Sequence, residues 1–259
     1  MKITSRENTQ YKEIKHLATD AKARRKAGKT VLDGIHLCQA YLEHIGAPLL
    51  CVTGETAQNS KEAVEIIQEC EKRKAVCLQL SSSLFKNISQ VENGIELLFL
   101  IDIPNTKIAD TKEKTIVCLD QVQDPGNLGS ILRSAASAGI KEIYCATGTA
   151  QVWSPRVLRA AMGAHFLLNV HENADLKEFL RTSSRMILAT SSHAKQTIFQ
   201  TDLRKPLIWL FGNEGQGVSA SLMEQATHLV SIPHKGKMES LNVASSAAIC
   251  LFEQVRQNL

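Results

Sequence analysis

The feature that most constrains this chain is a repeated pattern of a short apolar run, a break, and then small and apolar residues at helical spacing. The clearest example starts with apolar residues 116–119, breaks at Asp124-Pro125-Gly126, and continues as far as Gly139. Such runs are typical of buried strands, and a glycine commonly follows a helix end. Proline, glycine and aspartate favour a turn between the two elements. This stretch therefore predicts a strand, a tight loop and a helix.

The same alternation continues to the end of the chain and predicts an α/β fold. The predicted strands are 116–119, 142–146, 166–170, 186–189, 207–211 and 229–232. The predicted helices are 128–138, 154–162, 176–182, 219–226 and 243–257. Apolar strands joined by helical crossovers form a parallel sheet covered on both faces. The glycine spacings of the Rossmann and Walker nucleotide loops do not occur at the positions that these folds require.

The N-terminal part predicts a smaller α/β domain with three layers and no catalytic pattern. Its predicted strands are 30–32, 49–53, 75–80 and 96–101, and its predicted helices are 36–44, 61–73 and 82–90. A polar stretch without periodicity follows, which is typical of a linker. We therefore predict a domain at 1–105, a linker at 106–114 and a second domain at 115–259.

Composition excludes several classes of protein. The chain has 259 residues, of which 44% are hydrophobic and 22% charged, which is ordinary for globular domains. Its first residues are polar and no apolar run reaches membrane-spanning length, so a soluble cytoplasmic protein without a membrane segment is expected. The seven cysteines and eight histidines show no paired ligand spacing, so no metal site is expected.

The positive charge is concentrated at the N-terminus. Residues 1–30 contain nine basic and three acidic residues, a net +6, whereas the whole chain has +4, so the remainder carries about −2. A basic helix and turn can lie along phosphates, although a solvated helix face is the simpler alternative. The candidate RNA-binding residues are Lys22, Arg24, Arg25, Lys26 and Lys29.

Polar residues without an evident packing role mark three stretches of the C-terminal domain. The first contains Asn127 and Arg133, just after a predicted strand. The second is the glycine-rich stretch 212–217, which also follows a strand and contains Glu214. The third, 231–242, precedes the last helix. Ligands bind where loops leave the carboxyl ends of parallel strands, so the first stretch is a site candidate and the two later stretches share its character.

Together the three stretches resemble the three sequence motifs of the SpoU (TrmH-type) RNA 2′-O-ribose methyltransferases, members of the SPOUT superfamily. They occur in the family's order and keep its polar residues. The resemblance implies a trefoil-knotted C-terminal domain that binds S-adenosylmethionine and forms a homodimer with a composite active site. It also implies that the N-terminal part is a ribosomal-protein-like domain that binds substrate RNA.

The resemblance further implies roles for individual residues. The expected catalytic residues are Arg133, Asn127, Glu214, Ser240 and Asn242. The expected cofactor-binding residues are Gly212, Ile232, Leu241, Phe211 and Leu210. Arg133 corresponds to the family's proposed base, but a guanidinium stays protonated, so an electrostatic role is physically easier. For the other polar residues the simpler alternatives are a turn-former or helix cap for Asn127, a loop-stabilising carboxylate for Glu214, and caps of the last helix for Ser240 and Asn242.

We therefore expect an S-adenosylmethionine-dependent enzyme that methylates a ribose 2′-hydroxyl in structured RNA, with ribosomal RNA favoured because of the basic N-terminal domain. Transfer RNA is the alternative substrate. A catalytically silent RNA-binding or ribosome-assembly protein is the alternative of a different class, and the presence of all five polar site residues argues against it.

Overall fold

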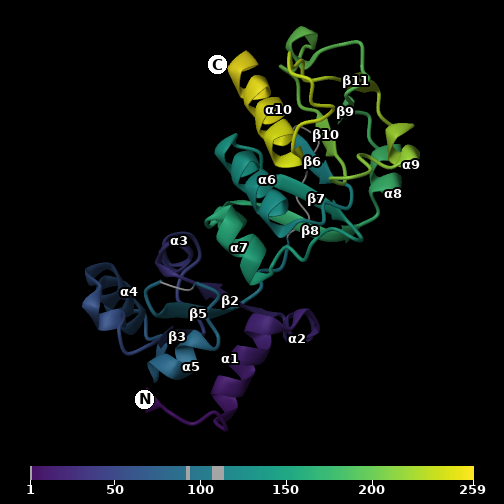
Figure 1. Ribbon diagram of the computed structural model, residues 1–259. Helices are drawn as coiled ribbons and strands as arrows, with labels where there is room; N and C mark the ends of the chain where they lie inside the picture. The colour runs from purple at the N-terminus through teal and green to yellow at the C-terminus, as the bar shows by residue number, and fades with distance from the viewer. Residues whose placement is uncertain (1, 92–93, 107–113) are drawn as a thin grey trace. The chain divides into compact units, whose positions relative to one another are not determined.

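The computed structural model describes residues 2–91, 94–106 and 114–259, which form two compact units (Figure 1). The first unit combines Met1–Asn105 with Trp153–Phe166, and the second combines Thr106–Val152 with Leu167–Leu259. The segment Trp153–Phe166, predicted as part of the C-terminal domain, thus packs in the first unit. Of the predicted linker 106–114, residues 107–113 lie outside the described residues.

The first unit is built on a mixed five-stranded sheet of order β1-β4-β3-β5-β2. Its strands are β1 (Lys2–Ile3), β2 (Lys29–Asp33), β3 (Leu50–Thr53), β4 (Val76–Leu80) and β5 (Leu97–Asp102). Strand β5 runs antiparallel to β2 and β3, while β1, β3 and β4 are parallel. The helices are α1 (Thr9–Thr19), α2 (Ala21–Ala27), α3 (Ile35–His44), α4 (Lys61–Lys72), α5 (Ser82–Lys86) and α7 (Pro155–Ala161).

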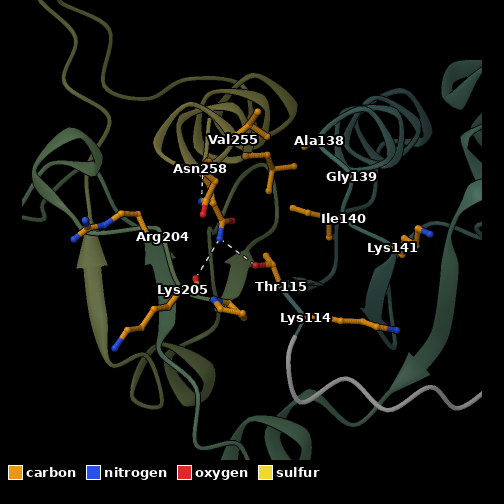
Figure 2. Close-up of a pocket in the computed structure, with 13 residues that line it drawn as sticks. Lys114, Thr115, Ala138, Gly139, Ile140, Lys141, Arg204, Lys205, Val255 and Asn258 are labelled. Carbon is orange, nitrogen blue, oxygen red and sulfur yellow. Dashed lines mark hydrogen bonds between the residues drawn. The ribbon is translucent and has the colours of Figure 1, made fainter.

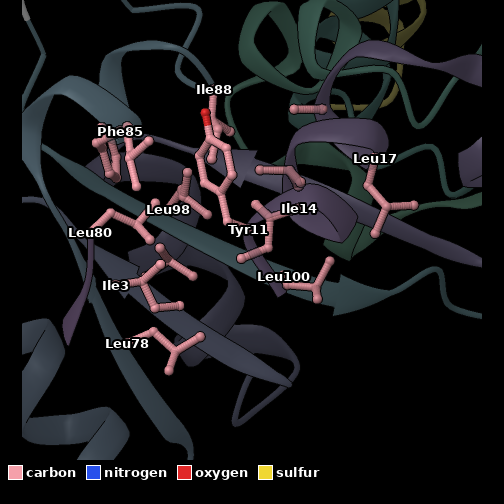
Figure 3. Packing of buried hydrophobic residues seen from close by; sticks show 14 residues of the cluster. Ile3, Tyr11, Ile14, Leu17, Leu78, Leu80, Phe85, Ile88, Leu98 and Leu100 are labelled. Atoms are coloured by element: carbon pink, nitrogen blue, oxygen red, sulfur yellow. The ribbon is translucent and has the colours of Figure 1, made fainter. Parts of the chain in front are cut away.

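Helix α1 covers one face of this sheet (Figure 3). Its residues Tyr11, Ile14 and Leu17 recur every three positions and are at most 2% exposed. They belong to one buried cluster with Leu98 and Leu100, alternate residues of β5. Because burying one large apolar side chain contributes about 1.5–3 kcal/mol, this layer stabilises the N-terminal unit substantially.

Specific contacts explain why the segment around α7 packs in the first unit. The buried Thr30 hydroxyl on β2 donates to the carbonyl of Trp153 at 2.7 Å. The Arg159 guanidinium donates to the carbonyl of Gln90 at 2.9 Å. The ring of Phe166 meets that of Tyr41 edge-on, with centroids 5.4 Å apart. A helical pattern alone does not reveal which sheet a helix covers. The sequence analysis therefore assigned α7 to the C-terminal domain from its position in the chain.

The second unit contains a six-stranded sheet of order β11-β9-β10-β6-β7-β8, and every pairing in it is parallel. The strands are β6 (Ile116–Leu119), β7 (Glu142–Ala146), β8 (Asn169–Ala174), β9 (Ile187–Thr190), β10 (Ile208–Phe211) and β11 (His228–Val230). The helices are α6 (Pro125–Ser137), α8 (Leu176–Arg181), α9 (Ala220–Met223) and α10 (Val243–Gln257). Of the three short 3₁₀ turns, Ala57–Asn59 belongs to the first unit, Ala164–Leu167 ends at the first residue of the second unit's last segment, and Ile198–Gln200 belongs to the second unit. The predicted parallel α/β fold is confirmed, although the strand predicted at 166–170 starts later, at Asn169, after one of these turns.

Helices cover both faces of the parallel sheet (Figure 1). Helices α6 and α10 lie side by side over one face, where the Trp209 indole donates to Gln254 at 2.8 Å. Leu210 points to the other face and belongs to a buried cluster with residues of α8 and α9. Within the described residues, no helix is long and apolar enough to cross a membrane.

The start of α6 differs from the predicted loop. The helix already begins at Pro125, and the Asp124 side chain caps it by accepting from the backbone N–H of Asn127 at 2.8 Å. Proline suits the first helical position because its fixed φ is helical and no N–H is needed there. Gly126 does not adopt positive φ, so the predicted turn is wrong and Asn127 lies in the first helical turn. The predicted helix end at Gly139 is confirmed, with φ of +77° directly after the cap residue.

We predict that Thr30→Val weakens the packing of the α7 segment. Valine keeps the shape of threonine but leaves the buried Trp153 carbonyl without its donor, so the free energy of unfolding should fall by about 1–3 kcal/mol. Urea unfolding followed by circular dichroism measures this loss. Thr53→Val is the matched control, because the Thr53 hydroxyl makes a longer bond of 3.4 Å at a partly buried position. Equal losses in the two variants would contradict the role of Thr30.

Candidate functional site

Loops that leave neighbouring strands meet at one edge of the parallel sheet. Strands β6 and β10 pair in parallel, so the loops that follow them leave the sheet side by side. The backbone N–H groups of Gln123 and Asp124, after β6, donate to the carboxylate of Glu214, after β10, at 3.1 and 3.0 Å. Two of the stretches that the sequence singled out are therefore joined directly.

A chain of side-chain hydrogen bonds connects the third stretch, residues 231–242, to the other two. The Asn127 amide donates to Glu214 Oε1 at 3.0 Å, and the Asn242 amide donates to Asn127 Oδ1 at 2.8 Å. Asn242 also caps α10, because its side chain accepts from two backbone N–H groups at the start of the helix. Of the two residues predicted to cap this helix, Ser240 and Asn242, the structure shows Asn242 in that role. Residues 115 positions apart in sequence thus share one network.

Glu214 follows a buried strand, yet its side chain is solvent-exposed. Its partial desolvation raises its pKa, but the hydrogen bonds from the Asn127 amide and from the backbone of Asp124 and Gln123 outweigh that effect. The pKa of Glu214 consequently lies below its ordinary value. The carboxylate therefore stays ionised at neutral pH and serves as the acceptor on which the network is built.

A pocket of about 570 Å³ opens beside this network. Predicted site residues that line it are Gly212, Glu214, Ile232, Ser240, Leu241 and Asn242. Its volume lies in the range of small-molecule sites, and it combines apolar side chains with backbone and hydroxyl groups. Phe211 and Leu210, predicted to bind the cofactor, are fully buried in the sheet and are not among the lining residues.

The glycine-rich loop that forms one wall of the pocket is held by its own backbone. Asn213 and Gly217 exchange two backbone hydrogen bonds of 2.9 Å, and Gly217 has φ of +72°. A side chain at Gly212 would overlap the backbone of Gly217, so glycine is required there for the loop to close on itself. The Asn213 amide donates to the carbonyl of Gln121 at 2.9 Å and ties this loop to the one after β6. The sequence analysis missed Asn213, although a polar residue directly after a buried strand was a signal for it.

Arg133 lies apart from the network. It is exposed on α6, and its side chain makes no hydrogen bond or ion pair with any described residue. Six helical positions separate it from Asn127, which places its side chain about 240° further around the helix axis. Arg133 is therefore free to meet a partner from outside its own unit.

The basic N-terminal residues divide into two groups. Lys22, Arg25 and Lys26 are exposed on or beside the solvent face of α2. Arg24 is only 5% exposed and its guanidinium donates to the Leu17 carbonyl at 2.8 Å, so it is a structural residue and not a surface RNA ligand. Lys29 is half-buried and lies 3.4 Å from the Glu13 carboxylate.

A second pocket, of about 480 Å³, lies between the C-terminal ends of α6 and α10 (Figure 2). The sequence analysis did not single it out. Its basic residues come from three segments and are Lys114, Lys141, Arg204 and Lys205. Cations near helix C-terminal ends are favoured by the helix dipole, and Arg204 also pairs with Asp202 at 2.8 Å. These charges therefore have a structural explanation. Among the described residues, no histidine, cysteine and acidic side chains gather in a group that could hold a metal ion.

Comparisons with known proteins agree with this architecture. The sequence profile of the SpoU rRNA Methylase family matches residues 114–252. An uncharacterised tRNA/rRNA methyltransferase of Synechocystis is 30% identical over 98% of this chain and 93% of its own length. The 23S rRNA (guanosine(2553)-2′-O)-methyltransferase RlmP of Bacillus subtilis is 28% identical over 96% of this chain and 97% of its own. The AdoMet-bound rRNA methyltransferase structure from Sinorhizobium meliloti superposes with a TM-score of 0.86 at 26% identity, covering 100% of this chain and 98% of that one.

We predict that Glu214→Gln lowers stability at neutral pH and that this effect disappears in acid. Because the folded-state pKa of Glu214 lies below its ordinary value of 4.5, its contribution is present above that value and is lost as pH falls through the folded-state pKa. The expected contribution is at most about 1 kcal/mol, since the carboxylate is largely exposed. Chemical unfolding of both proteins at a series of pH values measures it.

The matched control is Glu65→Gln on α4, where the carboxylate lies 3.9 Å from the Lys61 ammonium at the surface. This variant should unfold with a free energy close to that of the unchanged protein. A deficit in Glu214→Gln that persists undiminished at about pH 3 would contradict the role of the ionised carboxylate.

Proposed function

Because this chain belongs to the SpoU rRNA Methylase family, we propose that it is an S-adenosylmethionine-dependent enzyme that methylates a ribose 2′-hydroxyl in structured RNA. We further propose ribosomal RNA as the substrate, since relatives along nearly the whole chain carry that activity in their names. The observation that carries the proposal is the hydrogen-bonded chain Glu214–Asn127–Asn242 beside the 570 Å³ pocket.

The residues around the pocket fit S-adenosylmethionine. Ile232 and Leu241 offer apolar surface suited to an adenine ring, and the wall formed by the glycine-rich loop offers backbone groups for polar contacts. The backbone hydrogen bonds between Asn213 and Gly217, together with the Asn213 side chain, hold the conformation of this loop. When bound, S-adenosylmethionine supplies a methyl group activated by its sulfonium. This chain must then bind the two reactants and orient them.

Orientation is the role that we assign to the polar network. Holding a hydroxyl in line with an acceptor carbon can lower a barrier by up to about 7–11 kcal/mol in well-oriented systems. Asn127 is fixed from both sides, by Glu214 and by Asn242, so its first-turn position on α6 is rigid. Ser240 places an exposed hydroxyl at the pocket wall.

We assign Arg133 an electrostatic role. A guanidinium stays protonated at any working pH, so Arg133 can clamp a substrate phosphate and stabilise the developing alkoxide better than it can remove a proton. Its exposed position without an internal partner supports contact with a group from outside the unit.

We propose that the site is completed in a homodimer. In support, Arg133 points away from Asn127 on α6, and the neighbouring helix α10 leaves the Phe252 ring 47% exposed.

The proposal includes a trefoil-knotted path for the C-terminal part, supported by the family's motifs and by the parallel strand order. Acting on ribosomal RNA, the enzyme would work in the cytoplasm, and the exposed residues of α2 would contact RNA phosphates.

We predict that Arg133→Ala and Asn242→Ser each abolish methyl transfer but complement one another when mixed. Serine remains a good helix cap, so Asn242→Ser chiefly removes the bond to Asn127. If one chain supplies Arg133 and the other supplies the network, half of the randomly formed dimers contain one intact site. Activity should then recover to about a quarter of the original value. The measurement is transfer of labelled methyl to RNA after unfolding and refolding the mixture.

The control is a chain that carries both substitutions, which should rescue neither single variant. Light scattering of the unchanged protein should report a dimer, and RNA binding of Arg133→Ala should be nearly unchanged. Full activity of Arg133→Ala alone would reject its catalytic role, and inactive mixtures of folded dimers would reject the shared site.

We predict that replacing Lys22, Arg25 and Lys26 together by alanine weakens RNA binding in a salt-dependent way. Losing three phosphate contacts should reduce the slope of log affinity against log salt by about 2–3. Fluorescence anisotropy with a ribosomal RNA fragment at several salt concentrations measures the slope. The charge-matched control replaces Lys61, Lys72 and Lys86, which are exposed elsewhere in the first unit. If both triple variants reduced the salt slope equally, RNA affinity would depend on the total charge of the protein and not on the position of these residues on α2.

A further inference from the structure

The 232–241 loop forms one wall of the 570 Å³ pocket, with lining residues near both of its ends. It belongs to no helix or strand, and its residues from 233 onward are exposed. The chain is fixed just before and just after this loop. The backbone N–H of Ser231 donates to the Gln196 carbonyl at 2.9 Å, and Asn242 caps α10. The shape of the wall therefore depends on what holds the loop between these two points.

A single side chain makes all the hydrogen bonds of this loop that the structure describes. The His234 ring lies between two backbone carbonyl oxygens: Nδ1 is 3.0 Å from that of Ile232, and Nε2 is 2.9 Å from that of Met238. No other hydrogen bond or ion pair involves residues 232–241 within the described part of the chain. These two contacts, which we call the His234 bridge, close residues 232–238 into one turn.

Both contacts of the bridge require the ring to donate. A backbone carbonyl oxygen only accepts hydrogen bonds, and a neutral imidazole has one N–H donor and one acceptor nitrogen. A neutral ring can therefore make only one of the two bonds, and it turns a bare nitrogen towards the other oxygen. The imidazolium ion carries an N–H on both nitrogens, and hydrogen bonds from a charged donor are stronger than those between neutral groups. The complete bridge is therefore the geometry of the protonated ring.

We propose that His234 positions the wall of the cofactor pocket and that protonation of its ring, by completing the His234 bridge, tightens the binding of S-adenosylmethionine. This inference rests on the proposed function and adds a pH-dependent control of its cofactor site. Ile232 is part of the bridge and Leu241 follows in the same loop, so loss of one bond lets both apolar lining residues move. Histidine ordinarily changes charge between about pH 5 and 8, so the response falls in the physiological range.

The charged and titratable groups around His234 do not favour one sign. They come from its own loop and from the loops after β9 and β10 that line the same pocket, and they are Lys235, Lys237, Glu239, His193 and Glu214. All five are exposed, so solvent screens their effect on the ring. Two lysines oppose a positive ring and two carboxylates favour it, which leaves the two carbonyl acceptors as the specific stabilising contacts of the imidazolium.

The test is calorimetric titration of the full-length protein with S-adenosylmethionine at about pH 5.5 and about pH 7.5, on either side of the range where histidine changes charge. The unchanged protein should bind about fivefold more tightly at the lower pH, because the second bond of the bridge is present there. His234→Gln should bind with nearly equal affinity at both pH values, since glutamine does not titrate. His228→Gln, at an exposed histidine on β11 outside the pocket, should keep the original ratio.

The reciprocal effect distinguishes this role from a merely structural one. If protonation of His234 strengthens cofactor binding, then bound S-adenosylmethionine must move the proton titration of His234 to higher pH. Nuclear magnetic resonance of isotope-labelled histidine rings measures that titration with and without S-adenosylmethionine. An unchanged His234 titration, or equal pH ratios in the unchanged protein and His234→Gln, would overturn the inference while leaving the proposed function standing.

Absence of cofactor binding at both pH values would instead contradict the proposed function. Trypsin then decides about the bridge alone, because it cleaves after lysine and Lys235 and Lys237 are exposed within the closed turn. Faster cleavage at these two lysines in His234→Gln than in the unchanged protein and His228→Gln supports the bridge. Equal cleavage rates in the three proteins reject it.

Discussion

The hydrogen bonds that join Glu214, Asn127 and Asn242 are the interaction on which the rest of the site depends. Each residue comes from a different loop or helix start, and each could move independently without the others. The parallel pairing of β6 and β10 brings the first two loops together, and capping of α10 by Asn242 fixes the third. An exposed carboxylate with three donors can hold this arrangement because hydrogen bonds to a charged acceptor are stronger than those between neutral groups.

The network is exposed within one copy of the chain, so the proposed reaction would need groups from outside that copy to shield it from water. Glu214, Asn242 and Arg133 are all solvent-exposed. Electrostatic stabilisation of a developing charge is effective when water is excluded. In the proposed dimer, a second copy on one side and the bound RNA on the other would provide that exclusion. Positioning of the reactants and stabilisation of the developing charge would then use different parts of one sheet edge.

Much of this organisation could be predicted from the sequence, because apolar strands and three polar stretches are local signals. Asn127 was singled out in this way, the resemblance to the SpoU family added Glu214 and Asn242, and the structure joins all three by hydrogen bonds. Burial was harder to predict: Arg24 stands in a basic run, yet its side chain packs inward and donates to the Leu17 carbonyl. Contacts between distant segments, such as Thr30 with Trp153, depend on tertiary packing that no local pattern encodes.

The most direct test of the central claim is transfer of labelled methyl from S-adenosylmethionine to ribosomal RNA and, separately, to transfer RNA, each purified from cells that lack the protein. Ribose methylation is then mapped to single nucleotides. We predict label on a 2′-oxygen of ribosomal RNA and none on transfer RNA. Label on a base, or on neither RNA when cofactor binding is confirmed and assembled ribosomal particles are also tried, would contradict the account.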